Sequence, residues 1–300
     1  MSGEVVVGLP VEASPVVVTD SASVPAEPSS ELLYRHRPHL IAGAKEAWQR
    51  RSVTMVLAER DIRALYKQAV LGIGWAVLNP VISLVLFVLI FDRVKLFHEA
   101  GVPYALFSYV GILGWGFFSG SVGGGINALL GNKAMLAKTH FPRECFPLSQ
   151  VVEAIFSTVV ALAPLVILFF VVGFAPKLGT LWTPLYIVIA LACTTGATLI
   201  VSAVVIQARD LRQAIPIVLQ LGLFATPVVW KFSLIPHWAQ PLYSFLNPIG
   251  LVIDGVRQSM LLNKAPDWRL TAIAALGSVI YLVGGYYIFK RLEVHFADRA

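Results

Sequence analysis

Charge is scarce in this sequence. Only 13% of its 300 residues are Asp, Glu, Lys or Arg, whereas 57% are hydrophobic. Soluble domains carry about 25% charged residues, so this composition excludes a water-soluble protein. A bilayer accepts such a surface, and because every backbone amide in lipid must be paired within its own segment, helices are favoured over strands. The sequence therefore predicts an all-α integral membrane protein.

Motifs of enzymatic chemistry are lacking as well. No GxxxxGK[ST] loop occurs, and GNKAML at 131–136 lacks the ending that cradles a nucleotide, so the chain cannot use ATP alone. There is no GxSxG elbow, and the six histidines show no HExxH spacing. The two cysteines, Cys145 and Cys193, fall at different predicted depths, which argues against a disulfide. We predict no catalytic residue, no metal site and no cofactor in this chain.

Long apolar runs are abundant, and a crossing needs about 20 apolar helical residues. Sixteen of the 23 lysines and arginines fall on the side of both chain ends, which predicts that both termini are cytoplasmic. Six spans are predicted, at about 71–92, 104–125, 149–173, 182–206, 214–231 and 269–289.

Four segments follow from this pattern. Residues 1–30 hold four prolines and no lysine or arginine, so they lack the basic start of a secretory signal and are expected to be a disordered cytoplasmic tail. Residues 31–70 form a cytoplasmic segment, 71–290 the six-helix transmembrane domain, and 291–300 a cytoplasmic C-terminus.

An amphipathic helix is predicted before the first span. Its apolar positions fall within about 60° of one another at 100° per residue, and a helix of this kind with a tryptophan and basic flanks lies along the cytoplasmic membrane surface. The alternative is a helix packed on another protein. The apolar positions are Ile41, Ala44, Trp48, Met55, Ile62 and Tyr66.

Short helices are predicted between spans five and six. Asn247 and Pro248 form an N-cap and a first-turn proline ahead of LVIDGVRQSML. Asp254 and Arg257 then share a face. We expect re-entrant helices that dip into the outer leaflet, and a lid resting on the outer surface is the alternative.

Aromatic side chains form a stripe along the second span, and the fifth span contributes Gln220. Sugar rings stack on aromatic faces, so the stripe predicts a channel wall along which a glycan slides, although aromatics also fill helix packing. Glu153, one turn inside the third span, is interpreted as an interfacial anchor, with a transport role as the alternative. The stripe comprises Tyr104, Phe107, Trp115 and Phe118.

Three stretches together resemble one family. RDIRALYKQAVLGIGWAVLNP at 60–80 resembles the motif R-D-x-x-x-x-Y-K-Q-x-x-L-G-x-x-W-x-x-x-x-P that opens polysaccharide export permeases, the Wzm-type and teichoic-acid-type subunits of the type-2 ABC export superfamily. NKAMLAKTHFPRECFPLSQV resembles that family's K-x-x-F-P-R-x-x-x-P-L-S loop, and RDLRQAIPIVLQLGLFATPVVW with LNPIGLVIDGVRQSML also agrees. Asp254 departs from the Glu of many relatives.

The resemblance implies a homodimer that binds two copies of a cytoplasmic ABC ATPase, which binds the ATP and magnesium. It implies a channel in the bacterial plasma membrane for a lipid-linked polysaccharide, of O-antigen, teichoic acid or cell-wall galactan type, and no role for nucleic acid. Arg60, Asp61, Arg63 and Lys67 with Trp48 and Tyr66 would mark the interface helix and the start of the first span. The outer gate would comprise Asn247, Pro248, Asp254 and Arg257, and the loop that touches the ATPase would be Phe141, Pro142, Arg143 and Glu144.

The residues alone leave the role of that loop open, since a basic loop between spans also fixes topology. Two other functions are weighed against polysaccharide export. One is a type-2 ABC exporter of a drug or small lipid. The other is a membrane-embedded glycosyltransferase or acyltransferase, which would need an acid, base or metal cluster at a membrane face.

Overall fold

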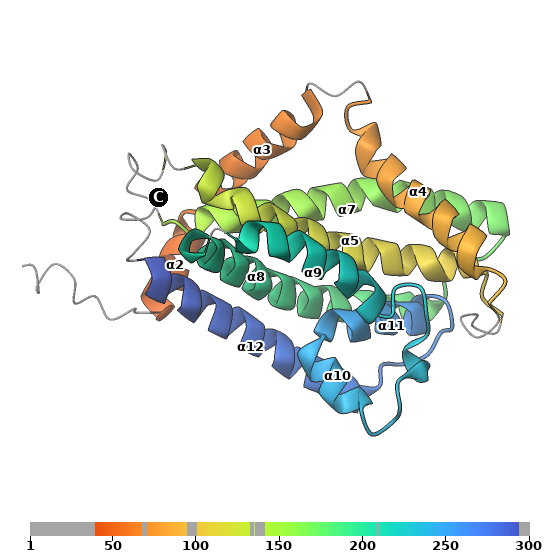
Figure 1. Cartoon of the computed structure of the whole chain (residues 1–300). Helices are drawn as coiled ribbons and strands as arrows, with labels where there is room; N and C mark the ends of the chain where they lie inside the picture. Colours follow the sequence, from red (N-terminus) through yellow and green to blue (C-terminus); the bar gives the residue numbers. More distant parts are fainter. Residues whose placement is uncertain are drawn as a thin grey trace, which may run out of the picture. The chain divides into compact units, whose positions relative to one another are not determined.

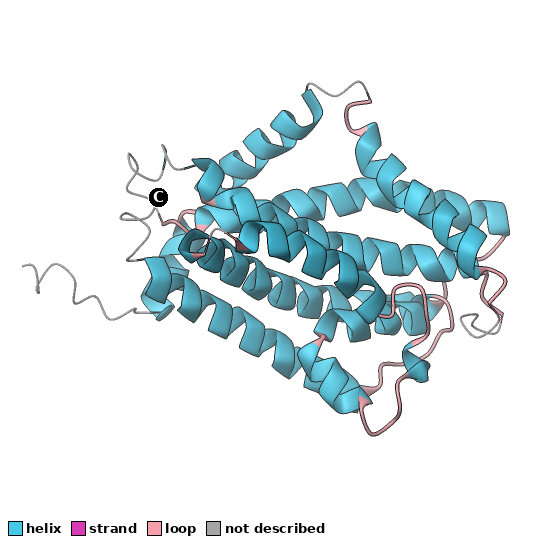
Figure 2. Ribbon diagram, viewed as in Figure 1, coloured by secondary structure: helices cyan, strands magenta, loops and turns pink. Residues whose placement is uncertain are grey.

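Every regular element that the structure describes is a helix. The computed structural model describes residues 40–67, 71–94, 101–132, 135, 142–208 and 210–293, and these contain helices and turns without strands (Figure 2). The predicted all-α fold is confirmed, while the tail 1–30 and most of segment 291–300 lie outside the described residues. The helices are α2 (Leu40–Gln49), α3 (Arg51–Lys67), α4 (Gly74–Phe91), α5 (Tyr104–Ala128), η2 (Leu130–Asn132), α7 (Cys145–Val172), η3 (Leu178–Trp182), α8 (Thr183–Gln207), α9 (Leu211–Ala225), η4 (Phe232–Leu234), α10 (Gln240–Leu246), α11 (Pro248–Met260) and α12 (Trp268–Glu293).

Five helices are long and apolar enough to cross a bilayer: α4, α5, α7, α8 together with η3, and α12. The count of six spans is not confirmed, because α9 has 15 residues and a helix of that length reaches about 22 Å against a hydrocarbon core of about 30 Å. The predicted fifth span ran to residue 231, but the helix stops at Ala225. Thr226 is already extended and Pro227 has no amide with which to continue the hydrogen-bond ladder.

The α5 helix lies at the centre of the bundle, with α4, α7, α8, α9 and α11 packed against it (Figure 1). Its contact with α8 is polar as well as close, since the Ser121 and Thr198 hydroxyls lie 2.8 Å apart and Ser202 donates to the Gly125 carbonyl at 2.9 Å. Small residues let these backbones approach, as in other membrane bundles. By contrast, α4 buries only Leu84 among its described side chains.

The segment before the first span differs from the prediction in two ways. It forms two helices, α2 and α3, rather than one, and α3 is packed against α7, with Leu57 and Ala58 only 3% and 1% exposed. Trp48 and Met55 of the predicted apolar stripe are 71% and 57% exposed and Ile62 is half-buried, while the side chains of Ile41, Ala44 and Tyr66 lie outside the described set. The placement of this stripe on the membrane surface stays a prediction, whereas the packing of α3 on α7 was missed.

The crossing of α8 and α12 depends on two glycines. A Cβ added at Gly196 would collide with the Tyr281 carbonyl, and one added at Gly285 would collide with the backbone of Gly196. We expect Gly196→Ala to lower the free energy of unfolding by about 1–3 kcal/mol, as overpacking does. Gly284→Ala on the same α12 helix is the control, because a Cβ there meets nothing within 4 Å. Thermal unfolding in detergent measures both, and equal stability of the two variants would contradict this packing.

Candidate functional site

The loop that precedes α7 is fastened to the end of α12. Glu144, 1% exposed, accepts a hydrogen bond from Lys290 Nζ at 2.8 Å and one from the Tyr286 hydroxyl at 3.3 Å. Arg143 Nη1 donates to the Glu293 carbonyl at 2.7 Å, and Lys290 also pairs with the Glu293 carboxylate at 2.9 Å. Burial raises the pKa of Glu144, and the positive charge of Lys290 opposes that rise. Arg143 and Glu144 are therefore both joined to the end of α12.

Three of the four residues predicted to touch the ATPase are described here. Pro142 and Glu144 are buried and Arg143 is half-buried, while Phe141 lies outside the described residues. Glu144 thus faces the chain's own α12 helix and not the surface. The sequence did not reveal Lys290 as its partner, because the two residues are 146 positions apart.

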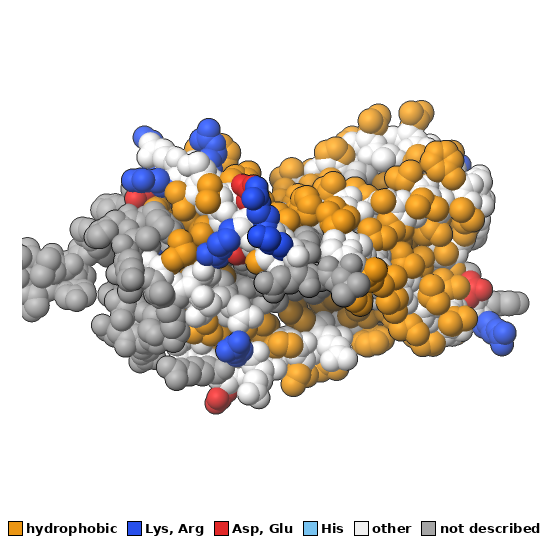
Figure 3. All heavy atoms as spheres, turned by 90° about the horizontal axis from the view of Figure 1, so that it is seen from above, with side chains coloured by type: hydrophobic (Ala, Val, Ile, Leu, Met, Phe, Trp, Pro, Cys, Tyr) orange, Lys and Arg blue, Asp and Glu red, His pale blue; other side chains and the backbone are white. Residues whose placement is uncertain are grey.

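A second link joins α3 to the start of α7. Asp61 Oδ2 accepts from Gln150 Nε2 at 2.8 Å and from the Ser149 hydroxyl at 3.4 Å. Its other oxygen accepts from Arg60 at 2.7 Å and 2.9 Å, while Arg63 pairs with Glu59. The charges of the first signature stretch therefore fix α3 on the bundle, and Figure 3 shows basic side chains gathered over this helix. Lys67 is exposed, and the side chain of Tyr66 lies outside the described set.

The predicted aromatic stripe divides into two halves. Tyr104 and Phe107 are each 3% exposed, and the Tyr104 hydroxyl donates to the Val229 carbonyl at 3.0 Å, so this half is enclosed by the chain's own helices. Trp115 and Phe118 are paired at 5.3 Å between ring centroids and line a cavity of about 440 Å³ between α5, α8 and α9. Gln220 is exposed on α9 and does not line that cavity.

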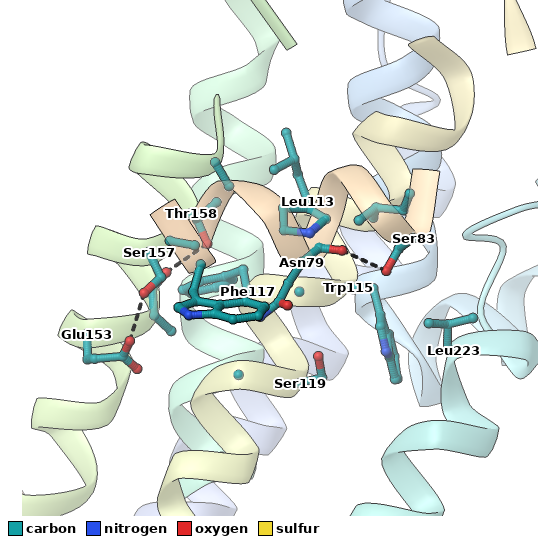
Figure 4. A pocket seen from close by; sticks show the side chains of 18 of the residues that line it. Asn79, Ser83, Leu113, Trp115, Phe117, Ser119, Glu153, Ser157, Thr158 and Leu223 are labelled. Carbon is teal, nitrogen blue, oxygen red and sulfur yellow. Dashed lines mark hydrogen bonds between the residues drawn. The ribbon is translucent and has the colours of Figure 1, made fainter. Parts of the chain in front are cut away.

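A second cavity, of about 550 Å³, opens between α4, α5 and α7. We call it the α4 groove. Its walls carry polar side chains from all three helices, as Figure 4 shows: Glu153 and Ser157 from α7, Ser119 from α5, and Asn79 and Ser83 from α4. The Ser157 hydroxyl donates to Glu153 Oε1 at 2.7 Å. Of these residues the sequence singled out only Glu153, although Asn79 inside an apolar run was an available signal.

Arg257 of α11 is 1% exposed. Its guanidinium donates to the Phe107 carbonyl at 2.8 Å, to the Pro227 carbonyl at 2.6 Å and to the Val228 carbonyl, and it stacks on the Phe107 ring at 3.7 Å. Gly111 makes room for it, because a Cβ there would meet Arg257 Nη2 and the Val228 carbonyl. One side chain thus ties α11 to α5 and to the segment after α9.

The other predicted gate residues lie around this point. Asn247 caps α11 as predicted, since its side-chain oxygen accepts from the Gly250 amide at 3.2 Å, and its amide donates to the Thr226 hydroxyl at 2.8 Å. Pro248 is buried in the first turn of α11. Asp254 is half-buried one turn before Arg257 and interacts electrostatically with it. Whether these helices dip into the bilayer stays a prediction.

The sequence of this chain is similar to one protein family and to several known proteins. The ABC-2 type transporter family, by its sequence profile, matches residues 52–261. The chain is 31% identical over 261 residues to the O-antigen export system permease protein RfbA of Myxococcus xanthus, covering 86% of this chain and 99% of that protein. It is 27% identical over 246 residues to a protein of the same name from Klebsiella pneumoniae, covering 81% and 93%.

The chain belongs to the ABC-2 type transporter family, which confirms the resemblance found in its sequence. It is a transport subunit, and the ATPase of such a transporter is a separate subunit.

Removal of Glu144 tests the cluster that it forms with Tyr286 and Lys290. Glu144→Ala leaves the Lys290 ammonium, whose side chain is 17% exposed, without its main partner, and we expect a loss of about 3 kcal/mol in the free energy of unfolding. Glu59→Ala, which breaks an exposed pair on α3, is the control and should cost less than about 1 kcal/mol. Unfolding in detergent measures both, and a Glu144→Ala loss as small as the control would refute the role of the cluster.

Arg257→Lys tests the bonds that Arg257 makes to three backbone carbonyls. A lysine ammonium lacks the fork of donors with which the guanidinium reaches all three, so we expect a loss of about 2 kcal/mol or more in the free energy of unfolding. Arg269→Lys, at an exposed position of α12, should leave stability unchanged. Comparable unfolding temperatures for the two variants would show that a fixed guanidinium is not required.

Proposed function

We propose that this chain is the permease of an ATP-driven exporter that moves a lipid-linked polysaccharide from the cytoplasm across the bacterial plasma membrane. Two copies form the channel and bind two copies of the ATPase. Both termini face the cytoplasm, and the polymer is of O-antigen, teichoic acid or cell-wall galactan type.

One observation carries the substrate class. The relatives named as O-antigen export permeases align with 81–86% of this chain and with 93–99% of their own lengths. Such agreement extends through the cytoplasmic loop, the spans and the outer helices together. It favours export of a polysaccharide over export of a drug or small lipid. An exporter of a drug or small lipid would share only the family with these relatives.

The geometry of the cytoplasmic end supports coupling to an ATPase. A loop that transmits force must be stiff and must be joined to the spans it moves. Residues 142–145 meet both conditions, because they begin α7 and are held to α12 by Arg143 and Glu144. Displacement of the loop by a partner would therefore shift α7 and α12 as a unit.

The aromatic lining supports a polymer path. Trp115 and Phe118 present rings to the cavity beside α9, and a Cβ at Gly222 of α9 would meet the Trp115 ring. Rings without charged neighbours hold sugar faces weakly, which suits sliding rather than capture. The path in this proposal uses the Trp115 half of the stripe, since Tyr104 and Phe107 are enclosed.

The test uses cells depleted of the chain. Lipid-linked glycan should accumulate inside, and re-expression should restore surface polysaccharide. Trp115→Ala should slow export roughly threefold to tenfold, the range expected from one lost aromatic contact, without reducing recovery of the complex with the ATPase. Trp238→Ala, at a tryptophan 83% exposed, is the matched control.

Three results would count against the proposal. The first is normal surface polysaccharide without the chain. The second is equal export by Trp115→Ala and Trp238→Ala, which would reject the path. The third is substantial ATP hydrolysis by the purified chain alone.

A further inference from the structure

The α4 groove contains polar groups that have no partner inside the protein. One oxygen of Glu153 is bonded to Ser157, but the other oxygen, the Asn79 side-chain amide and the Ser119 hydroxyl make no hydrogen bond within the described part of the chain. All three belong to helices long enough to span the membrane. Asn79 is exposed, and Ser119 and Glu153 are half-buried, so within a membrane a polar occupant that hydrogen-bonds to them would be favoured over hydrocarbon.

The chemistry of the walls indicates which occupant. A carboxylate accepts hydrogen bonds from hydroxyls, an amide donates and accepts, and a serine hydroxyl does both. Trp75, which is 42% exposed, and Trp115 add indole surfaces to the same cavity. Carboxylate, amide and indole together suit a sugar ring, whose edge carries hydroxyls and whose faces carry C–H groups.

Charge excludes the other part of a lipid-linked glycan. No lysine or arginine lines the groove among the described residues, and its one acidic residue there is Glu153. A phosphate or diphosphate would therefore find no cationic partner in this lining, whereas neutral hydroxyls need none. The volume of about 550 Å³ lies in the usual range of small-molecule sites.

We infer that the α4 groove binds a sugar residue of the exported glycan through Glu153, Asn79 and Ser119. This inference rests on the proposed function and adds to it a specific binding site, which shares Trp115 with the cavity lined by Phe118. Leu65 of α3 borders the groove, so the site lies beside the junction of α3 and α4. Glycan that reaches the cytoplasmic side of the first span would be held there before it enters the channel.

Two glycines allow a direct test. Gly116 and Gly120 line the groove, and a Cβ at either meets nothing within 4 Å, so cysteine fits at both positions. Gly284→Cys on α12 is the matched control, because it has the same open space and lies outside the groove. The native Cys145 and Cys193 are both buried, which keeps the background reaction with maleimide low.

The experiment measures maleimide labelling of the complete transporter, with its ATPase, in liposomes. Three conditions are compared: lipid only, added undecaprenyl phosphate, and added lipid-linked glycan extracted from cells depleted of the chain. We expect the glycan to slow labelling of Gly116→Cys at least fivefold and to leave Gly284→Cys unchanged. Glu153→Gln with Asn79→Ala in the Gly116→Cys chain should restore fast labelling, whereas Glu59→Gln should not.

The outcomes separate this inference from the proposed function. Equal labelling with and without glycan, in a chain that still exports polysaccharide in cells, overturns the sugar site and leaves the proposed function standing. If undecaprenyl phosphate by itself slows labelling, the groove is assigned to the lipid carrier. If labelling is already slow in the lipid-only condition, the groove is assigned to the second copy of the chain. Either result overturns the inference. Failure of depleted cells to accumulate glycan rejects the proposed function itself.

Discussion

The segment after α9 depends on satisfying backbone carbonyls where no helix can do so. After α9 stops, the carbonyls from Phe224 to Val229 leave the helical ladder; the Val228 amide donates to that of Thr226, and side chains bond to the other five. Trp230 donates to Phe224, Tyr243 to Ala225, Arg257 to Pro227 and Val228, and Tyr104 to Val229. In a bilayer, irregular backbone persists only with such partners. The short α9, the fold of α10 and α11 and the buried Tyr104 all follow from this requirement.

The two ends of the bundle are held by different forces. At the start of α7 the bonds join charged side chains to one another, as in the pair of the buried Glu144 and the half-buried Lys290. Around α11 one guanidinium meets neutral carbonyls instead. The first arrangement balances charge against charge, whereas the second satisfies backbone groups that have left a helix.

Local patterns in the sequence predicted much of this fold. The apolar runs placed α4, α5, α7, α8 and α12 within a few residues of their observed bounds, and Asn247 with Pro248 predicted the start of α11. Those signals lie in adjacent residues. The end of α9 was missed because hydropathy continues past Pro227 although the helix does not.

Such local patterns could not predict contacts between residues that are far apart in the sequence. The bond between Gln150 and Asp61, the pairing of Lys290 with Glu144 and the enclosure of Phe107 by Arg257 each join different helices. Periodicity places a residue on a face but does not identify what that face meets. For that reason the aromatic stripe was predicted as one surface, while in the structure its two halves have different neighbours.

The first span gives the α4 groove an unusual dependence on its surroundings. Leu84 is the one buried residue of α4, and seven of its 18 residues are exposed, so much of this helix faces away from the rest of the chain. In a bilayer, lipid acyl chains or neighbouring proteins would contact that face and contribute to the tilt of the helix. The spacing between α4 and α5 is then a joint property of the polypeptide and of the bilayer thickness, so the same sequence would present a wider or narrower groove in membranes of different composition.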